Sequence, residues 1–188
     1  MVACPFHVPY SPSAQRNPVL RSADLSTHQK NSPANNVEWL TPPEVISALG
    51  EFDLDPCTPE IMPWRTARHR YTRKDDGLIC PWFGRVWVNP PFGPYAPKWM
   101  DRLRQHGNGI ALIPARTETR MFFSSVWGQA DGACFIRGRM WFHHPDGRRF
   151  ANGTNAPVCL VAYGRKNLAS LYACGLGVVV SAGRKSRV

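Results

Sequence analysis

The sequence predicts an α/β domain built on a mostly parallel, doubly wound sheet with an added antiparallel strand. Strand and helix patterns alternate through the middle of the chain, which is typical of crossover connections between parallel strands. Nearer the C-terminal end, strand patterns follow one another directly, and this favours an antiparallel addition. The interval between residues 55 and 89 is too short for several strand–helix units, so we expect a reduced sheet in this half.

The composition is that of one globular domain preceded by an arm. Of the 188 residues, 43% are hydrophobic and 19% are charged. No apolar run approaches the ~20 residues of a membrane-spanning helix, so we expect no membrane partner. Residues 1–36 hold five prolines and few aliphatic side chains, which predicts a flexible N-terminal arm. The folded domain is expected over residues 37–180 and a basic tail over residues 181–188.

The first predicted element is a helix that begins at Thr41 and ends at Gly50. Thr41 is a capping residue type, Pro42 suits the first helical position, and Glu44 completes a capping box. Gly50 then provides the stop signal.

A strand is predicted over residues 51–55, where apolar and acidic residues alternate. The alternation puts Asp53 and Asp55 on one face, and Pro56 ends the strand. We therefore expect two carboxylates to be presented together at the carboxyl end of this strand.

The remaining elements are predicted from apolar runs and helical periodicity. Strands are expected over residues 85–89, 109–114, 132–137, 140–143, 157–163 and 176–180, and helices over residues 95–106 and 118–128. The apolar faces predicted for the two helices are Ala96, Trp99, Met100 and Leu103 in the first, and Phe122, Phe123, Val126 and Trp127 in the second.

The six cysteines lack the CxxC spacing of zinc sites, and several lie inside apolar runs. We interpret them as buried thiols in a reducing compartment. Because the chain also lacks a signal-peptide pattern at its start, we expect a cytoplasmic protein. His143 and His144 precede Asp146-Gly147, a dipeptide typical of hairpin turns, so no metal is expected.

The net charge of +10 lies almost entirely in the second half of the chain. Such an asymmetry favours a polyanionic partner, nucleic acid first, because basic side chains neutralise phosphates and release their counterions. The alternative is a basic surface that only aids solubility.

The segment Asn89-Pro90-Pro91-Phe92, called the clamp below, follows the predicted strand over residues 85–89. The two prolines fix the backbone and remove two N–H donors. The Asn89 side-chain oxygen and the Pro90 carbonyl are then two acceptors that can hold the NH₂ group of a planar amine. Phe92 can stack on a base, and a base amine inside a duplex is reached only when the nucleotide is flipped out.

The clamp resembles the Asn/Asp-Pro-Pro-Tyr/Phe motif of amino-directed methyltransferases that use S-adenosylmethionine. In order and together with its neighbours, it is similar to the phage-type DNA N6-adenine methyltransferases of the Dam family, over about residues 37–165. The resemblance is carried by Trp39, Thr41, Pro42, Trp82 and Trp99 and by residues 52–57, 76–78, 89–93, 112–117 and 137–139. It implies a Rossmann-like methyltransferase domain that methylates adenine N6 in DNA.

The resemblance also implies roles for individual residues. The catalytic residues are Asn89, Pro90, Pro91 and Phe92. The cofactor-binding residues are Trp39, Thr41, Pro42, Asp53, Asp55, Pro56, Cys57 and Asp76. The DNA-binding residues are Arg116, Thr117, Arg137, Arg139, Arg148 and Arg149. One departure is that no glycine-rich turn follows Asp55, whereas cofactor sites of this fold often have one.

Other readings of the same residues stay open at this point. RNA bases and protein glutamine side chains also present a planar amine, so the clamp alone does not select DNA. An inactive DNA-binding module of the same fold is a further alternative. Neither the recognition sequence, the oligomeric state nor a role in restriction–modification, defence evasion or gene regulation follows from the sequence.

Overall fold

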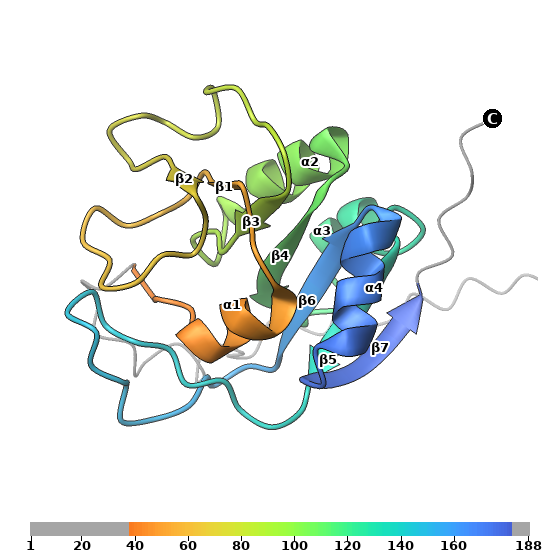
Figure 1. The fold of residues 1–188 in the computed structure, drawn as a ribbon. Coiled ribbons are helices and arrows are strands. Elements are labelled where there is room, and N and C mark those ends of the chain that lie inside the picture. Colours follow the sequence, from red (N-terminus) through yellow and green to blue (C-terminus); the bar gives the residue numbers. More distant parts are fainter. Residues whose placement is uncertain (1–37, 182–188) are drawn as a thin grey trace, which may run out of the picture. The chain divides into compact units, whose positions relative to one another are not determined.

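The computed structural model describes residues 38–181, so the expected arm and residues 182–188 of the expected tail lie outside the described part. Within this part, seven strands and four helices form an α/β fold (Figure 1). In chain order the elements are α1 Pro43–Leu49, β1 Leu54–Asp55, β2 His69–Arg70, β3 Val86–Val88, α2 Ala96–His106, β4 Gly109–Pro114, α3 Arg120–Ser125, β5 Gly132–Ile136, β6 Val158–Tyr163, α4 Arg165–Ala173 and β7 Gly177–Ser181.

The seven strands form one mixed sheet in the order β2-β1-β3-β4-β6-β5-β7. The pairs β1–β2, β1–β3 and β3–β4 are parallel. β6 is antiparallel to both β4 and β5, and β7 is antiparallel to β5. β1 to β5 therefore share one direction, and the antiparallel addition consists of two strands, β6 and β7, where one was expected.

The sheet is covered on both faces, as expected for a doubly wound arrangement. Alternate side chains of the central strands enter two separate apolar cores, because successive residues of a strand point to opposite faces. One core packs β-strand residues such as Val88 and Val161 against α2 and α3. The other packs residues such as Trp87 and Leu160 against α1 and α4.

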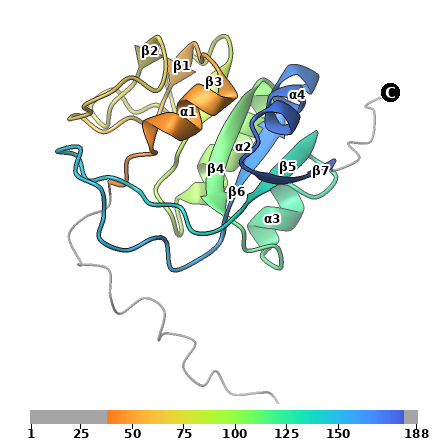
Figure 2. The ribbon, with the colours of Figure 1, turned by 60° about the horizontal axis from the view of Figure 1, so that its bottom comes forward.

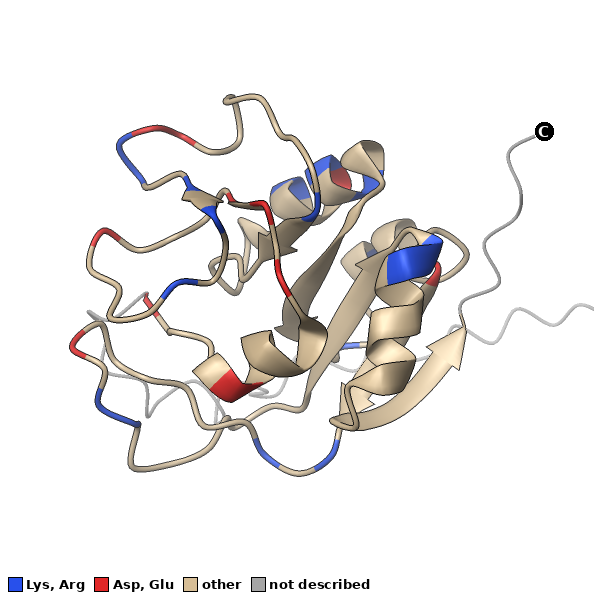
Figure 3. Cartoon of the chain, viewed as in Figure 1, with Lys and Arg blue, Asp and Glu red and all other residues tan. Residues whose placement is uncertain are grey.

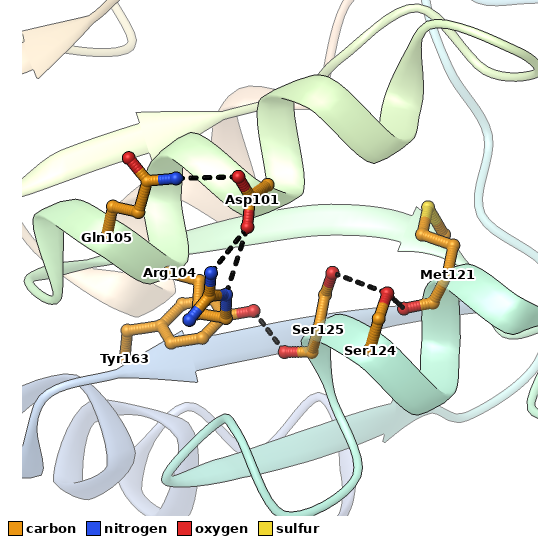
Figure 4. A network of polar contacts seen from close by, with 7 residues as sticks. All are labelled: Asp101, Arg104, Gln105, Met121, Ser124, Ser125 and Tyr163. Carbon is orange, nitrogen blue, oxygen red and sulfur yellow. Dashed lines mark hydrogen bonds and ion pairs between the residues drawn. The ribbon is translucent and has the colours of Figure 1, made fainter.

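The face that carries α2 and α3 is also held by polar contacts (Figure 4). The Tyr163 hydroxyl, at the end of β6, donates a hydrogen bond to the Ser125 carbonyl at the end of α3. On α2, the Asp101 carboxylate accepts hydrogen bonds from Arg104, at 2.6 Å for Nη2, and from Gln105 Nε2, also at 2.6 Å. The Tyr163 bond ties the end of α3 to the sheet, and the Asp101 contacts join successive turns of α2.

The half of the sheet next to β2 is reduced, as the sequence predicts. Two loops, residues 56–68 and residues 71–85, connect β1 to β2 and β2 to β3 without a helix (Figure 1). The Arg85 guanidinium compensates in part for the missing helices. It donates to the carbonyls of Leu49 and Glu51 and to the side chains of Asn167 and Ser170.

Several sequence predictions need correction. α1 starts at Pro43 with Pro42 as its N-cap, so Thr41 does not cap it and the capping box with Glu44 does not form. Residues 140–143 are not a strand: His143 forms only isolated bridges to Leu40 and Arg149, because no neighbouring strand is available to extend the pairing. β2 and α4 were not predicted.

α3 is shorter than predicted, and its apolar face is narrower. Phe122 and Val126 are fully buried, but the ring of Phe123 is 62% exposed. The other predicted helix face is correct, since Ala96, Trp99, Met100 and Leu103 of α2 are all buried.

The described cysteines are free thiols. Cys134 and Cys159 are buried in the sheet, and burial raises the pKa of each to about 12. Cys57, Cys80 and Cys174 are only half-buried, which corrects the expectation for these three. No helix in residues 38–181 is long and apolar enough to cross a membrane.

Candidate active site

The carboxyl ends of β1 and β3 bring two of the predicted site residues to one edge of the sheet, called the carboxyl edge below. β1 ends at Asp55, and Asn89 follows β3 directly. These strands are neighbours, and the chain passes from β1 to β2 on one side and then to β3 on the other. Ligands of open α/β sheets bind beyond the carboxyl ends of strands at such a switch point.

The Asn89 side chain is held in one orientation. Its Nδ2 donates a hydrogen bond to the main-chain carbonyl of Trp39 at 2.7 Å. Its Oδ1 accepts no hydrogen bond from any residue between 38 and 181, and the side chain is only half-buried. Pro90 and Pro91 carry no N–H group, so this stretch presents acceptors to an incoming group.

Phe92 of the clamp belongs to an aromatic cluster. It consists of Trp39, Phe92, Phe142 and Phe150. Trp39 and Phe92 meet edge to face, with ring centroids 5.9 Å apart, and Phe92 meets Phe142 in the same way at 6.0 Å. Phe92 is half-buried, so part of its ring is open to a ligand.

Asp55 is a buried carboxylate at the end of β1, with 3% of the residue exposed. Its Oδ1 accepts from the Cys57 main-chain N–H at 3.0 Å, and its Oδ2 accepts from the Thr66 hydroxyl. Burial raises the pKa of Asp55 to about 6, although these hydrogen bonds and the charge of Arg70 act in the opposite direction. Burial of a carboxylate raises the free energy of its charged form. A buried carboxylate with a raised pKa at a switch point of the sheet is typical of a functional site.

Asp53 does not join Asp55 as a second free carboxylate, which corrects that expectation. β1 contains only Leu54–Asp55, so Asp53 precedes the strand. Its Oδ2 accepts from the Arg85 main-chain N–H at 2.8 Å, and its Oδ1 lies 3.9 Å from an Arg68 nitrogen. Asp53 therefore braces the segment that leads into β3.

Thr41 is buried, with 2% of the residue exposed, and its hydroxyl has no hydrogen-bond partner in the described part of the chain. Its carbonyl, in contrast, accepts from the Trp64 indole N–H at 3.1 Å. A buried hydroxyl without a partner is costly, and it fits a site whose ligand supplies the missing hydrogen bond. Pro42, beside it, is also buried.

The loop after β1 is closed by a glycine that lies elsewhere in the sequence. A Cβ atom on Gly77 would lie 1.9 Å from the Pro56 carbonyl oxygen, so only glycine fits there. Asp76 precedes it with φ 54° and accepts from the Leu78 N–H at 3.2 Å, which stabilises the turn. Asp76 itself is exposed. Burial and the charge of Asp55 raise the pKa of the Cys57 thiol well above its usual range.

A cavity of about 380 Å³ lies beside Asp55 and was not predicted from the sequence. Thr66 both lines it and donates to Asp55, and Trp64 both lines it and donates to the Thr41 carbonyl. Asp55 and Thr41 do not line the cavity themselves; Thr66 and Trp64 stand between it and these two residues. Its walls come mostly from the helix-free loop between β1 and β2, and no sequence pattern predicted the conformation of this loop.

The predicted DNA-binding arginines gather at the carboxyl edge. Arg116 follows β4 and Arg137 follows β5, and both are exposed. The other three lie in the long connection between β5 and β6, which runs across this edge (Figure 2) and carries segments coloured blue for Lys and Arg in Figure 3. Thr117, predicted with Arg116, is half-buried, and its carbonyl accepts from the Trp127 indole at 3.2 Å.

The arginines of the β5–β6 connection have local partners. Arg139 donates to the Thr154 carbonyl, and Arg148 pairs with Asp146 at 2.7 Å. The Arg149 guanidinium carbon lies 4.4 Å from the centre of a Trp141 ring. Their positions are therefore restricted before any ligand binds.

The predicted hairpin turn is present between His144 and Arg148. The Gly147 N–H donates to the His144 carbonyl at 2.8 Å, and the His144 N–H donates to the Arg148 carbonyl at 2.8 Å. Among the described residues, no three His, Cys, Asp or Glu side chains converge as a metal site would require.

A model of a known protein family matches most of the chain. The family model described as DNA N-6-adenine-methyltransferase (Dam) matches residues 27–173, which is most of the chain and includes the clamp, Asp55 and the β5–β6 connection. Comparisons with curated proteins and with solved structures give no match. The chain therefore belongs to the Dam family of DNA N-6-adenine-methyltransferases.

Proposed function

We propose that the protein transfers the methyl group of S-adenosylmethionine to N6 of an adenine that is flipped out of duplex DNA into the site beside Asn89. The observation that carries this proposal is the hydrogen bond from Asn89 Nδ2 to the Trp39 carbonyl, which leaves Asn89 Oδ1 facing the site as an acceptor. An amine donor is the group that such an acceptor selects.

The chemistry requires holding the amine in a reactive geometry. The lone pair of an exocyclic amine is delocalised into the base, so it is a weak nucleophile. Asn89 Oδ1 and the Pro90 carbonyl would each accept one N–H, which favours the pyramidal nitrogen that attacks the methyl carbon. S-adenosylmethionine supplies that methyl on a positively charged sulfur. The sulfur–methyl bond breaks as the nitrogen–methyl bond forms, S-adenosylhomocysteine leaves, and the methylated nitrogen gives up one proton to solvent. Alignment of the reacting atoms provides most of the rate enhancement.

The residues near β1 fit the proposed cofactor. The unpartnered Thr41 hydroxyl can accept or donate a hydrogen bond, and the buried Asp55 carboxylate favours a positively charged ligand. The cavity lined by Thr66 and Trp64, which bond Asp55 and the Thr41 carbonyl, offers space nearby. Pro42, Pro56, Cys57 and Asp76 complete the proposed cofactor-binding set, and Asp53 would act indirectly, by holding the segment that leads into β3.

The DNA side of the proposal uses the carboxyl edge. Phe92 would stack on the flipped adenine. The predicted basic residues Arg116, Arg137, Arg139, Arg148 and Arg149 would contact phosphates, with Thr117 beside them. The insertion of antiparallel β6 between β4 and β5 supports a Rossmann-like methyltransferase fold for this domain. Free thiols favour the cytoplasm as its location.

The proposal is tested by incubating the full chain with S-adenosylmethionine labelled on its methyl group and separating DNA, RNA and protein acceptors. We expect label in DNA only, and digestion with methylation-sensitive enzymes then locates it. Label in RNA or protein would favour one of the other amine substrates. Label in none of them, from a folded sample that still shifts DNA in a gel, would favour an inactive DNA-binding module.

A further inference from the structure

We infer that Trp39 is the positioning residue of the clamp: its main-chain carbonyl orients Asn89 and its ring orients Phe92. This inference rests on the proposed function, because it assigns Trp39 to the alignment of the flipped base. It differs from the role that the family resemblance implies for Trp39, which is contact with the cofactor.

The first step concerns the two ends of the Asn89 amide. With Nδ2 bonded to the Trp39 carbonyl, Oδ1 is presented to the site. The flipped amide would place two carbonyl oxygens against each other and would present an N–H to an amine that also donates. The Trp39 carbonyl therefore decides whether the clamp offers an acceptor or a donor.

The second step concerns the Trp39 ring. It meets Phe92 at 5.9 Å with the ring planes 69° apart, an edge-to-face arrangement that aromatic pairs prefer. On its other sides it packs against Phe142, at 5.4 Å, and Phe150, at 5.8 Å. Trp39 thus contacts both functional side chains of the clamp.

The third step concerns what holds Trp39 itself. The next residue, Leu40, exchanges two backbone hydrogen bonds with His143, at 2.9 and 3.0 Å. Phe142 and Phe150 belong to the same β5–β6 connection, and Phe142 is only 2% exposed. The segment that carries the basic residues Arg148 and Arg149 therefore also fixes the residue that aligns the clamp.

The test compares Trp39→Leu with Trp39→Phe in the full chain. We expect Trp39→Leu to lower kcat by about tenfold or more, as when a positioning contact is lost, with the Kd for S-adenosylmethionine within about twofold of the wild type. Trp39→Phe should restore most of kcat, because a phenyl ring keeps contact with Phe92. Phe150→Leu, which leaves Trp39 and the clamp unchanged, should show a smaller loss of kcat.

Trp99→Leu is the matched control. Trp99 is a buried tryptophan on α2 that packs on Trp82, outside the clamp. It should lower the melting temperature at least as much as Trp39→Leu does and leave kcat unchanged. A second readout does not depend on activity. In NMR, the side-chain amide protons of Asn89 should exchange with solvent faster in Trp39→Leu than in the wild type, because without the packing of the indole on Phe92, Phe142 and Phe150 the main chain of residue 39 holds its carbonyl less firmly against Asn89.

Two results would overturn the inference. If Trp39→Leu weakens S-adenosylmethionine binding at least tenfold and keeps the wild-type kcat at saturating S-adenosylmethionine, Trp39 is a cofactor contact instead. Unchanged kcat together with unchanged amide exchange would show that the Trp39 ring positions neither Asn89 nor Phe92. Failure of the proposed function is separate: the wild type would transfer no methyl to DNA, and the amide-exchange measurement would still decide whether Trp39 orients Asn89.

Discussion

Asn89 Nδ2 lies 2.7 Å from the carbonyl oxygen of Trp39, a residue fifty positions earlier in the chain. The acceptor of the clamp is therefore oriented by a bond within the protein itself. Groups that are fixed in advance cost no reorganisation when the reaction occurs, which is the main source of electrostatic and positional catalysis.

Asn89→Asp should inactivate the enzyme although a carboxylate has more acceptor sites than an amide. Aspartate has no N–H to give to the Trp39 carbonyl, so its second oxygen would face that carbonyl and be repelled. We expect kcat to fall by about 100-fold, the usual cost of losing one oriented catalytic group. Single-turnover methylation of DNA measures this, and a variant that keeps at least half of the wild-type rate would contradict the role given to the bond.

Asp55→Asn should stabilise the protein without ligand at neutral pH and weaken cofactor binding. The folded-state pKa of Asp55 is about 6, above the ordinary 3.8, so the folded state holds its proton more tightly than the unfolded state. The contribution of this group to stability therefore decreases as pH rises from about 4 to about 6. At about 1.4 kcal/mol per pKa unit, the penalty above pH 6 is up to about 3 kcal/mol.

Urea unfolding of both proteins at pH 4.5 and pH 7.5 provides the check on Asp55. The free energy of unfolding of the variant minus that of the wild type should be larger at pH 7.5 than at pH 4.5. The Kd of the variant for S-adenosylmethionine should be higher than that of the wild type. An equal difference at both pH values would show that Asp55 is not a buried carboxylate of raised pKa.

Arg116→Ala combined with Arg137→Ala should weaken DNA binding and reduce its salt dependence. Each lost phosphate contact lowers the slope of log K against log salt by about 0.9. The control is Arg165→Ala combined with Lys166→Ala, because these residues follow β6, whose direction puts them at the opposite edge of the sheet. Gel-shift titrations at several salt concentrations should separate the two pairs, and equal effects would mean that net charge alone acts.

Arg85→Lys should destabilise the fold while keeping the charge. The guanidinium donates to four groups in two segments, residues 49–51 and α4, and stacks 4.2 Å from the centre of the Phe52 ring. Lysine cannot reproduce this fork, so we expect a loss of about 2 to 3 kcal/mol in the free energy of unfolding. Arg104→Lys, whose partner Asp101 is on the same helix, should cost less than about 0.5 kcal/mol.

The sequence predicted the central strands well, because β4 and β6 are unbroken apolar runs that lie in the middle of the sheet. It missed α4, where only Asn167 and Leu171 are buried and the helix has almost no apolar face. Asn167 instead bonds Arg85, Asn108 and the Tyr163 carbonyl, contacts that no local pattern reveals.

The candidate site was predicted only as far as local motifs reach. The clamp stands in one tetrapeptide that follows an apolar strand, so its place at the carboxyl edge could be foreseen. The contacts that shape the candidate site join distant segments. Asn89 donates a hydrogen bond to the Trp39 carbonyl, and Gly77 approaches the Pro56 carbonyl closely. Such pairs depend on the tertiary fold, and an unpartnered Thr41 hydroxyl becomes visible only when the neighbouring chain is in place.

The most direct test of the account is methyl transfer to duplex DNA by the wild type and by Asn89→Ala, with the methylated nucleoside identified by mass spectrometry after digestion. The account predicts N6-methyladenine from the wild type and none from the variant, whose melting temperature and affinity for S-adenosylmethionine stay close to those of the wild type. N6-methyladenine produced by Asn89→Ala at a comparable rate, or a different methylated nucleoside from the wild type, would contradict it.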